Sequence, residues 1–324
     1  MSEALNPELV LVVEVASSSL IARDIRCLEL VDPRGEDLPP FTPGAHLLVQ
    51  APNGMTRRYS LCNPPSERNH YLIAVKREPS GRGGSASMVD DVRCGDTMYV
   101  SLPRNDFELV DTASSHLLIA GGVGITPIRS MAYHLYERGR PFRLCYLTRE
   151  AEATAFGQEL AQSHFRDRVV IHHDHGDPDQ AFDLWPLLEK PKGGMHLWCC
   201  GPRTLMDAVR DMTGHWSSSA VHFEDFSARN VAHSAADKPF RVKLVPEGEA
   251  IDVPADVSIL EALRRHGYRV PSSCESGTCG TCRVKLIAGE PDHRDLVLTE
   301  EQRRREITVC VSRAHSAELV LQLS

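Results

Sequence analysis

The sequence lacks the features that would direct it to a membrane or to export. Its N-terminal stretch carries Glu3, Glu8 and Glu14 and no basic segment, which is not the pattern of a signal peptide. The longest apolar runs, such as 117–125, are short and broken by glycine, so none is long enough to span a bilayer. We therefore expect a cytoplasmic protein with no membrane partner, whose cysteines are ligands or free thiols rather than disulfides.

An excess of positive charge is also missing. The net charge of −8 comes from 36 Lys and Arg against 44 Asp and Glu, and it argues against a nucleic-acid partner. Residues 238–324 hold 13 basic and 13 acidic side chains, so the whole acidic excess lies in residues 1–237. The sequence shows no arrangement of nucleophile, histidine and acid, so we expect no obligatory acid or base catalyst.

Ten cysteines are present, and four of them follow a spaced pattern near the end of the chain. Cys274, Cys279 and Cys282 have the spacing C-x4-C-x2-C, and Cys310 follows after a longer gap. This is the plant-type spacing for a [2Fe-2S] cluster held by four thiolates. A structural zinc site usually has two C-x2-C pairs, so the pattern favours the cluster over zinc or four free thiols.

The residues around these cysteines predict a small domain over 238–324. Residues 257–263 carry apolar side chains at helical spacing and end at His266-Gly267, while 240–245 and 283–286 alternate as strands do. Together they resemble the plant-type ferredoxin fold, a β-grasp sheet covered by a helix. The preceding stretch, 227–237, is small, polar and aperiodic, and is predicted to be a linker.

The first third of the chain predicts an all-β domain. The length of 324 residues leaves room for two or three domains, and short β-rich runs separated by Pro, Gly and Asn clusters fill residues 1–108. Such spacing is typical of a barrel or sandwich. The runs are 9–15, 25–30, 46–50, 71–76 and 97–102.

A basic and glycine-rich part of this domain suggests a phosphate site. Gly83-Gly84-Ser85 leads into a short helical run, and a helix start offers free backbone N–H groups to an anion. Arg57 could add a charge-assisted contact, and Tyr59 offers a flat face to an aromatic ring. Each feature alone is common in ordinary turns and strands, but together they indicate a flavin phosphate site.

Residues 109–226 change to an alternation of strand-like and helical runs, which predicts an α/β domain with a parallel sheet. Its first turn holds Gly121, Gly122 and Gly124, which would let a pyrophosphate approach the backbone. Thr126 is expected to cap the following helix, with Pro127 as its first residue. The turn does not match G-x-G-x-x-G strictly. The prediction of a nucleotide site there rests on the position of the turn directly after the first strand.

Later residues of this domain carry weaker signals. Cys200-Gly201-Pro202 follows a strand at the sheet edge where ligands bind, whereas Cys199 fits a buried strand position. Arg149 follows the strand that decides ribose selectivity and could contact a 2′-phosphate. Phe226 fits either a flavin face or a core. The histidines that resemble a metal cluster fit a solvated loop better, namely His172, His173 and His175.

The order of these motifs resembles the phthalate dioxygenase reductase family, which belongs to the ferredoxin–NADP⁺ reductase-like superfamily. The resemblance covers nearly the whole chain and is carried by Arg57-x-Tyr59-Ser60, Gly83-Gly84-Ser85, the turn from Gly121, Cys200-Gly201-Pro202 and the four cysteines. It implies an antiparallel β-barrel flavin domain (1–108), a parallel-sheet α/β nucleotide domain (109–226), a linker (227–237) and a β-grasp ferredoxin domain (238–324).

The resemblance also implies cofactors and the residues that hold them. FMN is implied as the flavin, bound by Arg57, Tyr59, Ser60, Lys76, Gly83, Gly84 and Ser85. NADH is implied as the donor, bound by Gly121, Gly122, Gly124, Thr126, Cys200, Gly201 and Pro202. Cys200 and Phe226 would lie near the nicotinamide and the flavin face, and the cluster would be held by Cys274, Cys279, Cys282 and Cys310.

The function that follows is electron transfer from NADH through FMN and the [2Fe-2S] cluster to a transient protein partner. By the resemblance, that partner is a Rieske-type oxygenase or demethylase of aromatic catabolism. A flavin is expected between the two because NADH gives a hydride and the cluster accepts one electron at a time. Two alternatives remain: a reductase for another acceptor, and a non-enzymatic redox sensor that holds a cluster or zinc.

Overall fold

The computed structural model describes residues 8–79, 81, 83–226, 236–246, 248–272 and 274–323. The chain divides into two compact units, Met1–Gly201 and Pro202–Ser324. The domain boundaries predicted from the sequence stay predictions, and most of the predicted linker 227–237 lies outside the described residues.

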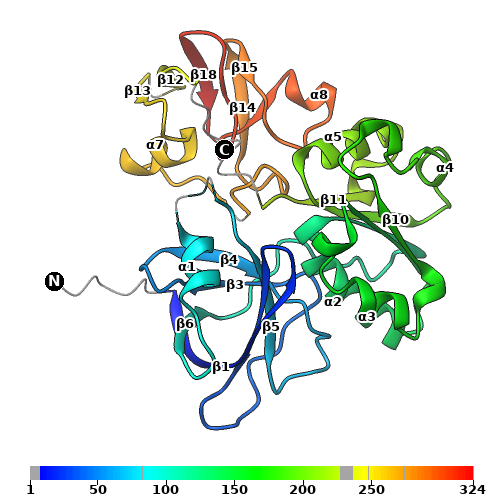
Figure 1. Cartoon of the computed structure of the whole chain (residues 1–324). Helices are drawn as coiled ribbons and strands as arrows, with labels where there is room; N and C mark the ends of the chain where they lie inside the picture. The colour runs from blue at the N-terminus through cyan, green and yellow to red at the C-terminus, as the bar shows by residue number, and fades with distance from the viewer. Residues whose placement is uncertain are drawn as a thin grey trace. The chain divides into compact units, whose positions relative to one another are not determined.

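The first unit begins with an antiparallel sheet that closes on itself (Figure 1). Its six strands lie in the order β4-β3-β6-β1-β2-β5, and a bridge between Leu61 and Ile73 joins the end of β4 to β5. Helix α1 (Gly84–Asp90) lies beside β4 and β5. The strands are β1 (Leu9–Ala22), β2 (Ile25–Val31), β3 (His46–Gln50), β4 (Thr56–Ser60), β5 (Tyr71–Lys76) and β6 (Thr97–Ser101). The predicted flavin-domain barrel is thus confirmed.

Alternating side chains determine which face of these strands is buried. In β1, Val13 and Val15 are fully buried and Glu14 between them is exposed, as a two-residue period requires. Five of the strands coincide with predicted runs, although β1 continues to Ala22. The sixth, β4, was not predicted, because Arg57 and Arg58 break the apolar alternation.

A parallel sheet follows in the same unit, where β10, β7, β8 and β9 lie side by side in that order. Helix α2 packs buried side chains such as Ile128 and Met131 against this sheet. The bounds are β7 (Ser115–Gly121), α2 (Ile125–Glu137), β8 (Phe142–Thr148), α3 (Gly157–Gln162), β9 (Val169–His173), α4 (Trp185–Leu188) and β10 (Met195–Cys200). The alternation of strand and helix was predicted. Helices α3 and α4 are shorter than the helical runs 154–163 and 182–188 expected from the sequence.

The prediction that Thr126 caps helix α2 was wrong. A 3-10 turn over Gly122–Gly124 precedes the helix, so α2 begins at Ile125 with Gly124 as its N-cap residue. Thr126 therefore lies inside the first turn, where its hydroxyl donates to the Val123 carbonyl at 3.0 Å. Thr126 is buried and helps to hold the glycine turn from within the helix.

The second unit contains α5 (Arg203–Met212), β11 (Val221–Glu224) and a domain with its own core. The sheet of that domain has the order β13-β12-β18-β14-β16, with β12 parallel to β18 and antiparallel to β13. Its elements are β12 (Phe240–Leu244), β13 (Ala250–Val253), α7 (Ile259–Arg265), β14 (Arg283–Ala288), β15 (Pro291–Asp292), α8 (Glu300–Arg303), β16 (Glu306–Thr308), β17 (Arg313–Ala314) and β18 (Glu318–Gln322).

Helix α7 covers the core of this sheet, as the sequence predicted (Figure 1). The hydroxyl of Ser258 accepts a hydrogen bond from the Glu261 N–H at 3.1 Å and caps its start. Glu261 in the first turn and Arg264 and Arg265 in the last turn suit the helix dipole. The predicted ferredoxin-like β-grasp arrangement is thereby confirmed.

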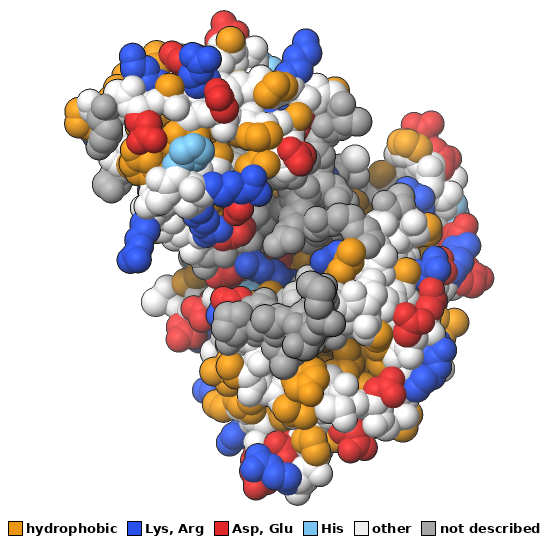
Figure 2. Space-filling model, turned by 90° about the vertical axis from the view of Figure 1, so that its left-hand side faces the viewer, with side chains coloured by type: hydrophobic (Ala, Val, Ile, Leu, Met, Phe, Trp, Pro, Cys, Tyr) orange, Lys and Arg blue, Asp and Glu red, His pale blue; other side chains and the backbone are white. Residues whose placement is uncertain are grey.

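Charges of both signs are mixed on the face of the described residues that Figure 2 shows. Figure 2 shows Lys and Arg side chains interspersed with Asp and Glu over the face in view. Among the described residues, no helix has the length and apolar character needed to cross a membrane.

Candidate functional site

The four predicted ligand cysteines lie in two pairs in the second unit. Cys274 lies beside Cys279 and Cys282 lies beside Cys310, close enough for the two thiols of each pair to act on one another. In each pair this interaction lowers the pKa of one thiol, Cys274 or Cys282, and raises the pKa of its partner. Cys274 also acts electrostatically on Cys282 and Cys310, so the two pairs face each other.

This pairing fits a [2Fe-2S] cluster, in which four thiolates are shared between two irons. Within the described residues, no group of three or more His, Cys, Asp or Glu side chains could hold a metal ion. Two sulfurs on each side, rather than three around one point, is the arrangement that a two-iron cluster needs. Three of the cysteines are buried and Cys279 is half-buried, so the site is sheltered from water.

The backbone of the cysteine loop also fits such a group. Gly277 has a φ of +75°, and a Cβ there would lie 2.7 Å from Val311 and 3.1 Å from the Cα of Asp295. The N–H of Ser276 donates to the Cys274 sulfur at 3.4 Å, and the backbone of Gly277 acts to lower the pKa of the Cys310 thiol. The loop therefore turns its amides toward the sulfurs, which stabilises negative charge there.

Residues of the predicted flavin phosphate site come together in the first unit. A Cβ on Gly84 would lie 2.8 Å from Nε of Arg57, so the guanidinium packs directly on the start of α1. Gly83 precedes the helix with a φ of +88°, and no side chain caps the helix start. Asn53, which sequence reasoning missed, donates from Nδ2 to the Gly83 carbonyl at 3.1 Å and holds this turn.

Tyr59 lies on the same strand as Arg57, and its hydroxyl is left without a partner. That oxygen is buried and makes no hydrogen bond with any described residue. Its burial raises the pKa of the phenol. A buried hydroxyl without a partner is costly in a folded protein, so one that no described residue satisfies fits a bound group that would supply the partner.

The remaining predicted flavin residues lie nearby in the fold. Lys76 ends β5 and forms an ion pair with Glu78, with 2.8 Å between Nζ and Oε1. The hydroxyl of Ser85 accepts a hydrogen bond from the Glu78 N–H at 3.1 Å, so Glu78 joins Lys76 to α1. Ser60 is buried and pairs across the sheet with His46 of β3.

The predicted nucleotide turn meets the Cys200 segment, as expected for one ligand site. A Cβ on Gly124 would overlap the Cys200 carbonyl and lie 2.8 Å from the Gly201 nitrogen. Gly122, in contrast, has a φ of +53° and open space where a side chain would be. The ends of β7 and β10 thus present backbone with no side chain between them, which suits a pyrophosphate.

Other residues considered in the sequence analysis make ordinary packing and hydrogen-bond contacts. Cys199 is fully buried in β10, and its burial raises the pKa of the thiol. The imidazole of His173 contacts the Thr148 hydroxyl at 2.8 Å, and that of His172 contacts the Gln180 carbonyl at 2.7 Å. Phe226 is 47% exposed and is the last described residue before 236.

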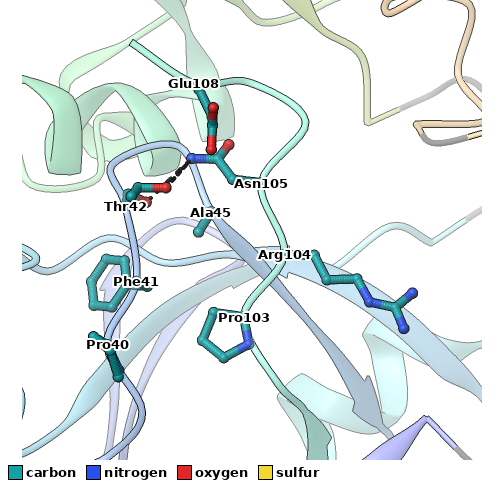
Figure 3. Close-up of a pocket in the computed structure, with 8 residues that line it drawn as sticks. All are labelled: Pro40, Phe41, Thr42, Ala45, Pro103, Arg104, Asn105 and Glu108. Atoms are coloured by element: carbon teal, nitrogen blue, oxygen red, sulfur yellow. Dashed lines mark hydrogen bonds between the residues drawn. The ribbon is translucent and has the colours of Figure 1, made fainter. Parts of the chain in front are cut away.

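A cavity of about 320 Å³ opens elsewhere on the barrel (Figure 3). The amide of Asn105 points to Thr42 and donates to its hydroxyl at 2.8 Å. None of the predicted cofactor residues lines this cavity. Its lining residues are Pro40, Phe41, Thr42, Ala45, Pro103, Arg104, Asn105 and Glu108.

Two parts of the chain match models of known domain families. Residues 12–109 match the model of the oxidoreductase FAD-binding domain, and residues 242–315 match that of the 2Fe-2S iron-sulfur cluster binding domain. The phthalate dioxygenase reductase of Burkholderia cepacia is 56% identical over 311 residues, which cover 96% of each chain. The chain belongs to the phthalate dioxygenase reductase family.

Two further relatives of this family agree. The phthalate 4,5-dioxygenase oxygenase reductase subunit of Pseudomonas putida is 51% identical over 96% of each chain. A solved phthalate dioxygenase reductase, described as a modular structure for electron transfer from pyridine nucleotides to [2Fe-2S], matches with a TM-score of 0.70. That match has 56% identity and covers 97% of this chain and 98% of the other. The chain is therefore a flavin and iron–sulfur oxidoreductase of the reductase-component type.

Proposed function

We propose that this reductase oxidises NADH, uses FMN as its flavin and delivers single electrons from its [2Fe-2S] domain to a Rieske-type oxygenase or demethylase. The observation that carries the proposal is the pairing of four sulfurs, Cys274 with Cys279 and Cys282 with Cys310. The flavin supplies the exchange between a hydride and single electrons when it is bound.

In this proposal the chain's own residues position the donor and the flavin. The bare backbone at Gly124 and Cys200 receives the pyrophosphate of NADH, and Gly122 leaves open space in front of it. Arg57 and the start of α1 hold the flavin phosphate by charge and by free N–H groups. The hydroxyl of Tyr59 donates a hydrogen bond to the flavin and thereby gains the partner it lacks.

FMN is favoured over FAD by the family resemblance, although the matching domain model is named for FAD. NADH is favoured over NADPH in the same way. Arg149 is exposed beyond the end of β8 and is the side chain that would contact a 2′-phosphate. The Rieske-type partner follows from relatives that are named as reductases of dioxygenases. The alternative function is a reductase for an acceptor protein outside the oxygenases. That function would use the same cofactor-binding residues.

The first experiment is an absorbance spectrum of the purified protein, followed by acid release and mass analysis of the flavin. We expect overlapping flavin and iron–sulfur bands, bleaching by NADH and release of FMN. Release of FAD would overturn the FMN assignment. A colourless protein without iron and sulfide, prepared fresh without oxygen, would overturn the whole proposal.

A second experiment tests the route of the electrons. Cys279→Ser should keep NADH-dependent reduction of a dye that accepts electrons from the flavin, and should lose rapid reduction of cytochrome c. Cys94→Ser is the matched control, because Cys94 is an exposed cysteine of the barrel domain and not a predicted ligand. Undiminished cytochrome c reduction by the Cys279 variant would exclude the path through the cluster.

A further inference from the structure

A buried histidine–aspartate contact lies against the cysteine loop, and no role assigned so far uses it. Asp295 is fully buried, and the side chain of His293 is 13% exposed. Nδ1 of His293 lies 3.7 Å from Oδ1 of Asp295. Both atoms are buried and neither has a hydrogen-bond partner among the described residues.

The other polar atoms of the two side chains already have hydrogen-bond partners. These partners determine which ring nitrogen of His293 carries the hydrogen. Nε2 of His293 lies 2.9 Å from the Arg303 carbonyl, which can only accept, so Nε2 carries the hydrogen. In the neutral ring Nδ1 is then a bare acceptor that faces a carboxylate oxygen. Oδ2 of Asp295 accepts from the Leu298 N–H at 2.9 Å and from the Arg303 guanidinium at 3.4 Å, so Oδ1 is the oxygen that lacks a donor.

Adding one proton turns this contact between two acceptors into a favourable one. When Nδ1 is protonated, the imidazolium donates toward Oδ1 and the two acceptors become an ion pair. The side chain of His293 is partly exposed, although Nδ1 and Oδ1 are buried. The contact is therefore a buried site for a single proton, built from two side chains.

The site is joined to the cluster loop through one residue, Gly277. The N–H of Leu296 donates to the Gly277 carbonyl at 2.9 Å, and the Gly277 backbone lies close enough to the Cys310 thiol to act on its pKa. An added negative charge nearby favours the charged imidazolium over the neutral ring, and so raises the proton affinity of the ring. An electron in this domain would therefore favour the protonated form of His293.

The charged groups packed around the pair are themselves paired. Arg303 of α8 lies 3.4 Å from Oδ2 of Asp295 and 3.5 Å from Glu300. Arg294 and Arg313 form ion pairs with Asp237, and Arg294 also does so with Asp292. Histidine is the one residue type among these side chains that exchanges protons readily, and His293 is the histidine of the set.

We propose that His293 and Asp295 form a proton-binding pair that takes up one proton when the cluster domain gains one electron. The electron comes from the flavin and the proton comes from water. When the electron leaves for the acceptor, His293 returns the proton to solvent, so charge and atoms balance. The inference needs a cluster but does not rest on NADH, on FMN or on the identity of the acceptor.

The test is the midpoint potential of the cluster in the holoprotein, followed by electron paramagnetic resonance from about pH 5.5 to about pH 8.5, where a histidine titrates. We expect the potential to fall as pH rises, by up to about 59 mV per pH unit, the value for one proton per electron. His293→Gln should flatten this slope. His266→Gln is the matched control, because His266 is an exposed histidine at the end of α7, and it should retain the slope.

A flat profile in the wild type, or an unchanged slope in His293→Gln, would overturn the proposal. If the glutamine variant does not fold, Asp295→Asn should reduce the slope through loss of the carboxylate. Carbon-detected NMR of ring-labelled histidine in the wild type provides a readout without any substitution. It should show a higher pKa for His293 in the reduced protein than in the oxidised one, and equal values would count against the pair.

Discussion

Gly124 lies so close to Cys200 that a side chain at Gly124 would overlap the Cys200 carbonyl. The obstacle is backbone, which cannot rotate away as the end of a flexible side chain can. The close approach brings the first glycine turn against the end of β10 and keeps this part of the proposed nucleotide site free of side chains.

Gly124→Ala should therefore damage both the fold and the NADH reaction. We expect a loss of about 1–3 kcal/mol in the free energy of unfolding, typical of overpacking, and a clear fall in NADH-dependent dye reduction. Gly193→Ala is the control, because a Cβ at Gly193 meets nothing within 4 Å. Urea unfolding and steady-state kinetics measure the two effects, and equal behaviour of both variants would contradict this interpretation.

Two glycines of the cysteine loop should differ in their tolerance of alanine. Gly277 and Gly280 have φ values of +75° and +72°, so alanine at either position carries a similar backbone strain of about 1–3 kcal/mol. Only Gly277 also faces close contacts, at 2.7 Å to Val311, whereas Gly280 has its nearest contact at 3.5 Å. We expect Gly277→Ala to lose most of its iron and sulfide and Gly280→Ala to retain most of it. Metal analysis decides, and equal contents would refute the steric argument.

Tyr59→Phe separates the stability of the apo-protein from flavin binding. Removal of a buried hydroxyl that has no partner should leave the unfolding free energy of the apo-protein unchanged or slightly higher. Loss of a hydrogen bond to the flavin should weaken FMN binding by about tenfold. Fluorescence titration of the apo-protein measures this, with Tyr99→Phe on the exposed side of β6 as control. Unchanged FMN affinity would show that the hydroxyl has another partner.

His46 should make the barrel sensitive to acid. Burial lowers the pKa of His46 to about 4, below the ordinary value of 6.5, so the unfolded chain binds the proton more readily. Stability is therefore fully present above about pH 6.5 and is lost as the pH falls toward 4, by up to about 3 kcal/mol. Urea unfolding at several pH values should show this loss in the wild type and in His164→Gln, an exposed control, but less of it in His46→Gln. An identical pH profile in all three proteins would contradict the assignment.

The sequence was most informative where chemistry or periodicity is local. The spacing of Cys274, Cys279 and Cys282 predicted the cluster domain, because a tight loop around a cluster permits few spacings. The short β-rich runs predicted most strands of the barrel, and the change of period after residue 108 predicted the parallel sheet.

What the sequence missed depends on contacts between distant residues. The start of α2 was misplaced because the glycines at 122–124 form a 3-10 turn, which places Thr126 inside the helix. Strand β4 is held by pairing with β3 rather than by its own apolar pattern. His293 approaches Asp295 and the Arg303 carbonyl only after the chain has folded, and no spacing in the sequence signals that contact.

The position of β18 in its sheet has a consequence for biosynthesis. Because β18 lies between β12 and β14, the two halves of this sheet are joined only through it. A nascent chain that has not yet produced Glu318–Gln322 holds two separate fragments of sheet, and such small fragments are marginal in water. We therefore expect stable iron binding at Cys282 and Cys310 to require the pairing of this strand with both of its neighbours.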